Sequence, residues 1–161
     1  MSKPYRNTRF LAFDAPLLSV KRRKAVPHKF VLEALAALSP WTRPIFGCLA
    51  VYVDDKIVLI LRDKRDKTAD NGVWLATTEE HHESLRREFP NMRSIHVFGK
   101  KETGWQVLPA DAPDFEDAAL RACELVVGRD PRIGKVPGAR RSSRSAAKSR
   151  AKSSKPASKQ A

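Results

Sequence analysis

The sequence predicts one α+β domain with a mainly antiparallel sheet, in the element order α-β-β-β-α-β-β-α, between two basic ends. Runs of apolar residues that meet across short turns predict hairpins, and hairpins join antiparallel strands. Segments with apolar residues at helical spacing precede, separate and follow these runs. An order dominated by hairpins, with helices left to pack on one sheet, is typical of the α+β class.

Changes in composition along the chain predict three parts. Residues 1–26 form a basic N-terminal arm, residues 27–137 form the folded domain, and residues 138–161 form a disordered tail rich in Lys, Arg, Ser and Ala. The chain has 161 residues, which is enough for one ordinary domain with extensions at both ends.

The first half of the domain is predicted to form a helix followed by a hairpin. The stretch "VPHKFVLEALAALSP" predicts a helix with Pro27 in its first position and Ser39-Pro40 at its end. The stretches "IFGCLAVYV" and "IVLILR" predict two strands joined by a turn at Asp54–Lys56. Both strands are almost continuously apolar, so we expect this hairpin to lie in the middle of the sheet.

The second half begins with the charged loop "DKRDKTADNG", whose Asn-Gly end signals a turn, and continues with a third strand, "VWLA". The stretch "TTEEHHESLRREF" predicts a helix in which Thr77 and Glu80 have the spacing of a capping box. The stretches "SIHVFG" and "GWQVLP" predict a second hairpin across "KKET". Asp114 is expected to begin a last helix that runs to Val127 and ends at Gly128.

Charge is distributed very unevenly. The chain has 31 Lys and Arg against 18 Asp and Glu, a net charge of +13. Met1–Lys29 has a net charge of +7 and Gly138–Ala161 one of +8, whereas Phe30–Pro137 has a net charge of −2. The basic character therefore belongs to the two ends.

Basic ends of this kind predict a nucleic-acid partner, with DNA expected and without readout of base sequence. A flexible Lys/Arg-rich arm gains affinity for any polyanion by releasing counterions. The tail contains no Leu, Ile, Phe or Trp that would insert into a membrane. The cluster "KRRK" at Lys21–Lys24 fits a solvated linker as well as it fits a phosphate-contacting arm, and a nuclear import signal is a third, much weaker interpretation. The candidate phosphate contacts are Lys21, Arg22, Arg23, Lys24, Arg140, Arg141, Arg144, Lys148, Arg150, Lys152, Lys155 and Lys159.

The tail also has a helical spacing. Six of its basic residues follow one another at intervals of three or four, which would align them in one stripe if the tail became helical on a duplex. Pro156 would limit that helix. An unstructured polycation is the alternative reading, because the tail has no apolar residues to bury.

The sequence predicts no catalytic residues, no metal site and no cofactor. His81 and His82 are adjacent and point about 100° apart on a helix, so they cannot chelate one ion together. Cys48 and Cys123 lie in apolar contexts and are expected to be buried thiols of a reducing compartment. No apolar run is long enough to cross a membrane, and the N-terminus is a poor secretory signal, so the expected location is the cytoplasm or nucleoid.

The three tryptophans receive different predictions. Trp74 and Trp105 each open a short apolar strand, so we expect them in the core. Trp41, in "SPWTRP", is predicted to lie exposed in a loop near Arg43, where both residues are candidates for a partner contact.

The stretch "RPIFGCLAVYVDDKIVLILRD" resembles the N-terminal domain of the TfoX/Sxy family. That family begins its sheet with Met-Phe-Gly-Gly, which corresponds here to residues 45–48, with Ile45 and Cys48 replacing the Met and the second Gly. The late strand "GWQVLP" and the acidic-capped last helix extend the resemblance over Phe30–Gly128. It implies a small antiparallel α+β domain without catalytic residues, in a family linked to the regulation of natural competence and transcription.

Three functional hypotheses follow. The first is a non-enzymatic regulatory or nucleoid-associated protein whose domain mediates protein contacts or dimerisation, while its basic ends bind nucleic acid. The second is a protein-binding adaptor that makes its contact through a sheet edge or the Trp41 region, while the tail only adds affinity for acidic partners or RNA. The third, a small enzyme, would require a deep pocket holding two or more of Cys48, His96, Tyr52 and Glu124.

Overall fold

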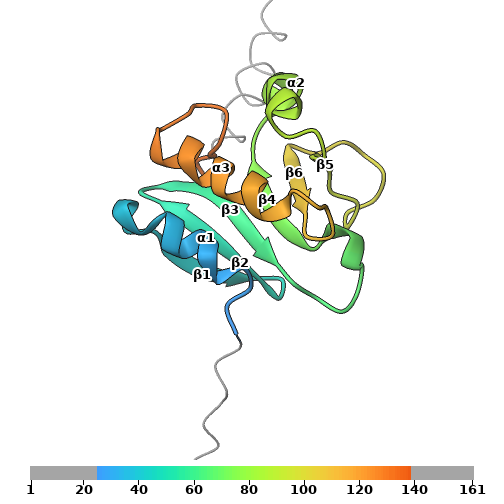
Figure 1. The fold of residues 1–161 in the computed structure, drawn as a ribbon, viewed down its shortest axis with the longest axis horizontal. Coiled ribbons are helices and arrows are strands. Elements are labelled where there is room, and N and C mark those ends of the chain that lie inside the picture. The colour runs from blue at the N-terminus through green and yellow to red at the C-terminus, as the bar shows by residue number, and fades with distance from the viewer. Residues whose placement is uncertain (1–24, 139–161) are drawn as a thin grey trace, which may run out of the picture.

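The structure is a computed structural model that describes residues 25–138. The basic cluster at Lys21–Lys24 and all candidate contacts from Arg140 onward lie outside the described residues. The described residues form one antiparallel six-stranded sheet with three α-helices, so the predicted α+β class is confirmed (Figure 1).

The elements follow one another along the chain, and the sheet keeps close to that order. They are α1 (Lys29–Ala34), η1 (Ala36–Leu38), β1 (Trp41–Ile45), β2 (Cys48–Val53), β3 (Lys56–Arg62), η2 (Thr68–Asp70), β4 (Gly72–Ala76), α2 (Glu79–Glu88), β5 (Arg93–Ser94), β6 (Trp105–Pro109) and α3 (Phe115–Val127). The spatial order of the strands is β1-β2-β3-β4-β6-β5, and every neighbouring pair is antiparallel. The apolar β2–β3 hairpin lies inside the sheet, as predicted.

The largest departure from the predicted elements is β1. Trp41 and Arg43 were predicted to lie in a loop, but they belong to an edge strand that pairs with β2 over its whole length. Pro44 obscured this strand, because proline cannot donate a hydrogen bond within a sheet. An edge strand tolerates it, since its nitrogen can face away from the neighbouring strand.

Smaller corrections concern the ends of elements. Of the strand predicted at "SIHVFG", only Ser94 belongs to the sheet, as the second residue of β5. The strand ends there because the backbone N–H of His96 donates to the Asp70 carboxylate at 2.8 Å instead of extending the sheet. The helix α2 has Thr78, not Thr77, at its N-cap, so the predicted capping box does not form. The helix α1 covers only Lys29–Ala34, so Pro27 lies outside it and the predicted end at Ser39-Pro40 was too late; Ala36–Leu38 form the separate 3-10 helix η1. Asp114 and Gly128 occupy the cap positions of α3 as predicted, but the Asp114 side chain forms no cap hydrogen bond and instead accepts one from Asn91 at 2.8 Å.

The sheet has two apolar faces because successive side chains of a strand point to opposite sides. In β4, Val73 and Leu75 face α1 and α3, which lie across one face in Figure 1, whereas Trp74 and Ala76 point to the other face. Within residues 25–138, no helix packs on this second face, and Ile95 and Val97 after β5 cover only part of it. We call it the open face.

The segment after α3 returns to the sheet and ties three elements together. The backbone of Lys135 exchanges two hydrogen bonds with Ile57 at the start of β3, each 2.9 Å long. The Arg132 guanidinium forms ion pairs with Glu88 at 2.6 Å and with Asp130 at 2.8 Å. The hydrogen bond from Arg132 lowers the pKa of the Asp130 carboxyl. This clamp places Lys135 over the Trp105 ring, 5.3 Å from its centroid.

Candidate binding groove on the open face of the sheet

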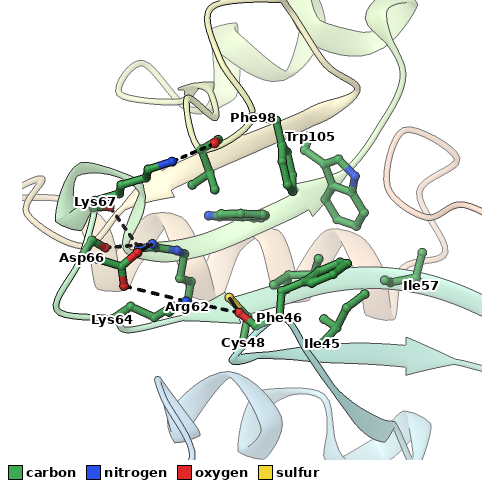
Figure 2. A pocket seen from close by; sticks show the side chains of 13 residues that line it. Ile45, Phe46, Cys48, Ile57, Arg62, Lys64, Asp66, Lys67, Phe98 and Trp105 are labelled. Carbon is green, nitrogen blue, oxygen red and sulfur yellow. Dashed lines mark hydrogen bonds and ion pairs between the residues drawn. The ribbon is translucent and has the colours of Figure 1, made fainter.

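A groove of about 270 Å³ runs along the open face. Figure 2 shows Phe46 and Ile45 on one side of it, Phe98 and Trp105 on the other, and charged side chains at one end. The lining residues are mainly apolar and include four aromatic rings. They are Ile45, Phe46, Cys48, Ile57, Ile60, Arg62, Lys64, Asp66, Lys67, Trp74, Val97, Phe98 and Trp105.

One wall is the two-residue turn between β1 and β2. Phe46 and Gly47 occupy this turn, and both have positive φ angles, 47° and 75°. Hairpins favour two-residue turns of this kind, but they usually place Asn, Asp or Gly in both positions. A bulky side chain at positive φ is strained. Phe46 nevertheless occupies the first position, and it is 82% exposed.

The opposite wall is the loop after β5. Phe98 is 63% exposed and meets the Trp74 ring edge-on, with the ring centroids 6.4 Å apart. Trp74 is buried, as predicted, and its indole N–H donates to the Asp70 carbonyl at 2.7 Å. Trp105 is only partly buried, so the prediction of a core residue was too strong for it. Trp74 and Trp105 lie side by side, with their ring centroids 6.4 Å apart.

The charged end of the groove belongs to the loop between β3 and β4. The Lys64 ammonium donates to the carbonyl of Phe46 at 3.3 Å, and the Lys67 ammonium donates to the carbonyl of Val97 at 3.1 Å. Two lysines of one loop therefore hold the two aromatic walls. Figure 2 shows both contacts as dashed lines.

A buried arginine organises this loop from beneath. Arg62 is only 2% exposed, and its guanidinium donates to the carbonyls of Lys67 at 3.0 Å and Asp66 at 2.9 Å, and to the Asn71 side chain. Asn71 in turn exchanges two hydrogen bonds with the backbone of Lys64, 2.7 and 3.0 Å long. A buried guanidinium is stable only when its donors are satisfied, so the loop conformation and the burial of Arg62 depend on each other.

Asp70 links this loop to the wall that carries Phe98. Its buried carboxylate accepts hydrogen bonds from Arg93 at 2.9 Å and from the backbone N–H of His96 at 2.8 Å. The sequence showed "DKRDKTADNG" as a charged loop with a turn signal, but it did not show that Asp70 and Asn71 would be structural anchors. No local pattern indicates this role, because their partners are up to 26 residues away.

The predicted partner-contact residues lie on the same face but outside the lining of the groove. Trp41 is 48% exposed, and its ring stacks on Tyr52 with the centroids 3.9 Å apart. Its indole N–H donates to the Asp54 carbonyl at 3.0 Å. Arg43 is exposed on the same edge strand. Trp41 is exposed as predicted, although Phe46, which the sequence did not single out, is more so.

The residues weighed for chemistry do not converge. Of Cys48, His96, Tyr52 and Glu124, only Cys48 lines the groove. Cys48 is half-buried at the start of β2, which corrects the prediction of a buried strand residue. Cys123 is buried as predicted, and burial raises the pKa of its thiol to about 11.

The helix α2 holds an unusual histidine. His82 is buried, and its Nε2 atom has no hydrogen-bond partner among the described residues. Burial is the main cause that lowers the pKa of the His82 imidazole, and Arg86 adds to it. In residues 25–138, no group of three or more His, Cys, Asp or Glu side chains is arranged to hold a metal ion.

Comparison of the chain with models of protein families, with curated proteins and with solved structures finds no match. The likeness to the TfoX/Sxy domain therefore stays a prediction. None of the helices in the described part of the chain is long and apolar enough to span a membrane.

Proposed function

We propose that this chain is a non-enzymatic, regulatory nucleic-acid-binding protein. In this proposal a TfoX-like domain is the scaffold, and the basic ends bind phosphates without reading base sequence. The separation of charge carries the proposal: the two ends have net charges of +7 and +8, whereas Phe30–Pro137 has a net charge of −2. Phosphate contacts of this type position a protein on nucleic acid but do not specify a site.

The surface of the domain supports the assignment of phosphate binding to the two ends. Several of its exposed cations pair with acids of the domain itself, which leaves them less charge for a polyanion. Arg86 pairs with Glu102 at 3.2 Å, Arg121 pairs with Glu124 at 2.8 Å, and Arg129 pairs with Asp54 at 2.7 Å. We therefore expect the ends to supply most of the electrostatic affinity.

The test is a salt titration of duplex-DNA binding. If all eight basic residues of the tail neutralise phosphates, they contribute about −7 to the slope of log K against log salt, and a shallower value is expected for a flexible arm. A full-length variant with all eight replaced by Gln should lose most of the slope. Replacing Arg86, Arg121 and Arg129 by Gln is the control and should change it little. An unchanged slope in the tail variant would contradict the proposal.

A second candidate, an adaptor or homodimer, is favoured by the half-exposed Trp41 on edge strand β1. Pro44 has no N–H group to offer an added strand, so such a contact would use side chains rather than strand pairing. Sedimentation of the wild type and of Trp41→Ala tests the homodimer. A dimer that the substitution dissociates would favour the homodimer, and a monomer in both would contradict the homodimer.

A further inference from the structure

We propose that the groove on the open face holds one unstacked base of single-stranded DNA, with a neighbouring phosphate at Lys64 and Lys67. This inference rests on the proposed nucleic-acid function and deepens it. It names the form of the nucleic acid and the part of the folded domain that meets it.

The aromatic walls are the first reason. Phe46 and Phe98 are the two most exposed large apolar side chains of the described residues, and both line this one groove. Trp74 and Trp105 line it between them. Proteins that bind single strands stack bases on such rings, which accept any base because every base has a π-face.

The conformation of Phe46 is the second reason. Asn, Asp or Gly would fit its left-handed backbone with less strain, and its exposed ring gains little from packing within the domain. Strained residues of this kind cluster at ligand sites. The turn thus keeps an aromatic ring at the mouth of the groove where the fold itself does not require one.

Charge complementarity is the third reason. Each lysine ammonium has three N–H donors, and Lys67 uses one of them on Val97, so two remain for phosphate oxygens. Lys64 contacts Phe46 and, at 3.8 Å, the Asp66 carboxylate. Lys135 adds a cation beside Trp105. A flat aromatic ring with a negative charge next to it matches this arrangement, and a nucleotide has both.

The size and the polar groups of the groove narrow the ligand further. Its volume of about 270 Å³ lies just below the usual range for sites of drug-sized ligands, roughly 300–1,000 Å³, so it suits one ring system. Bases inside a duplex are stacked and cannot enter it. The lining is mainly apolar and can contact the 5-methyl group of thymine, which uracil lacks. We therefore name DNA as the ligand, and a preference for RNA is an outcome of the test.

The experiment must separate the groove from the basic ends, which bind any polyanion. The full-length chain is titrated with a labelled thymidine 12-mer and with an abasic 12-mer that has the same phosphates but no bases. Each titration is repeated over a range of salt. The slope against log salt reports phosphate contacts, whereas the affinity extrapolated to 1 M salt reports the contacts that remain when the phosphates are screened.

We expect the wild type to bind the two oligomers with the same slope and the thymidine oligomer with the higher affinity at 1 M salt. Phe98→Ala should lower that affinity by about 5- to 150-fold, the range found for loss of one base-stacking contact. It should leave the abasic oligomer and both slopes unchanged. Leu120→Ala, which removes an exposed apolar side chain from α3, is the matched control and should change nothing.

Three results would overturn the inference: equal affinity of the wild type for both oligomers at 1 M salt, an equal loss of both in Phe98→Ala, or tighter binding of a uridine 12-mer than of the thymidine 12-mer. Failure of the proposed function is a separate outcome, because it would appear as a flat salt dependence for every oligomer. Thermal unfolding of Phe98→Ala near the wild-type temperature checks that the variant is folded.

Discussion

The two faces of the sheet are built from the same strands, but in the described residues helices cover only one of them. The face under α1 and α3 is closed, and residues such as Leu59 and Leu75 are fully buried there. On the open face the same alternation places Ile60 and Trp74 under a thin cover of sheet and loop side chains. Strand alternation therefore makes two apolar faces, and the packing of the helices decides which one stays accessible to a ligand.

The largest expected difference between the faces is in stability. Leu75→Ala should lower the free energy of unfolding by about 2–5 kcal/mol, because it leaves a cavity in a closed core. Phe98→Ala on the open face should lower it by about 1 kcal/mol or less, since it removes mainly the edge contact with Trp74. Urea unfolding of both variants measures the difference. Similar losses would mean that the open face is closed in solution.

The second prediction concerns the strained turn on the open face. Phe46→Asn should raise the free energy of unfolding by about 1 kcal/mol, because Asn tolerates the left-handed conformation that Phe does not. Phe46→Ala is the control: it removes the ring but keeps a strained residue, so its stability should stay near that of the wild type. The same Asn variant should bind the thymidine oligomer less well, since ligand sites often trade stability for function. A less stable Asn variant would show that the ring packs on the fold after all.

The smallest effect concerns His82, a buried residue of α2. Its environment consists of Glu79 and Arg86 on α2, together with Glu102 and Lys135 from other segments. Burial holds the folded-state pKa of this imidazole below its ordinary value of 6.5. Between these two pKa values the unfolded chain binds more protons than the folded one, so the free energy of unfolding falls as pH falls through 6.5.

The measurement is urea unfolding of the wild type and His82→Leu between pH 7.5 and pH 5.5. The leucine variant removes both the titrating group and the unpaired Nε2 atom, so its stability should decline less toward low pH. Parallel curves for the two proteins would exclude His82 as the source of the pH dependence.

The sequence was sufficient for the parts of the fold that depend on local patterns. Apolar runs located β2, β3, β4 and β6, and spacing located the three helices. The edge strand β1 was not predictable, because Trp41–Ile45 becomes a strand only by pairing with β2 and contains a proline. The end of β5 depends on Asp70, which lies more than twenty residues earlier and draws the chain out of the sheet.

The groove could not be read from the sequence for a related reason. The residues that line it come from separated turns, and nothing in the neighbourhood of Phe46 or Phe98 distinguishes an exposed ring from a buried one. Their exposure follows from the absence of a helix layer over this face in the described residues. The charged loop was recognised as a loop, but its contacts with both walls of the groove depend on carbonyl groups that are 18 and 30 residues away.

The link that Lys64 and Lys67 make between the two walls of the groove has a thermodynamic consequence. Both lysines extend from one loop whose conformation Arg62 and Asn71 stabilise, so the turn bearing Phe46 and the loop bearing Phe98 are tied to the same segment. These hydrogen bonds restrict both walls before a ligand enters. A ligand that enters the groove loses its own conformational entropy, but the groove itself loses little more. Weak contacts with a single flat ring can therefore yield measurable affinity.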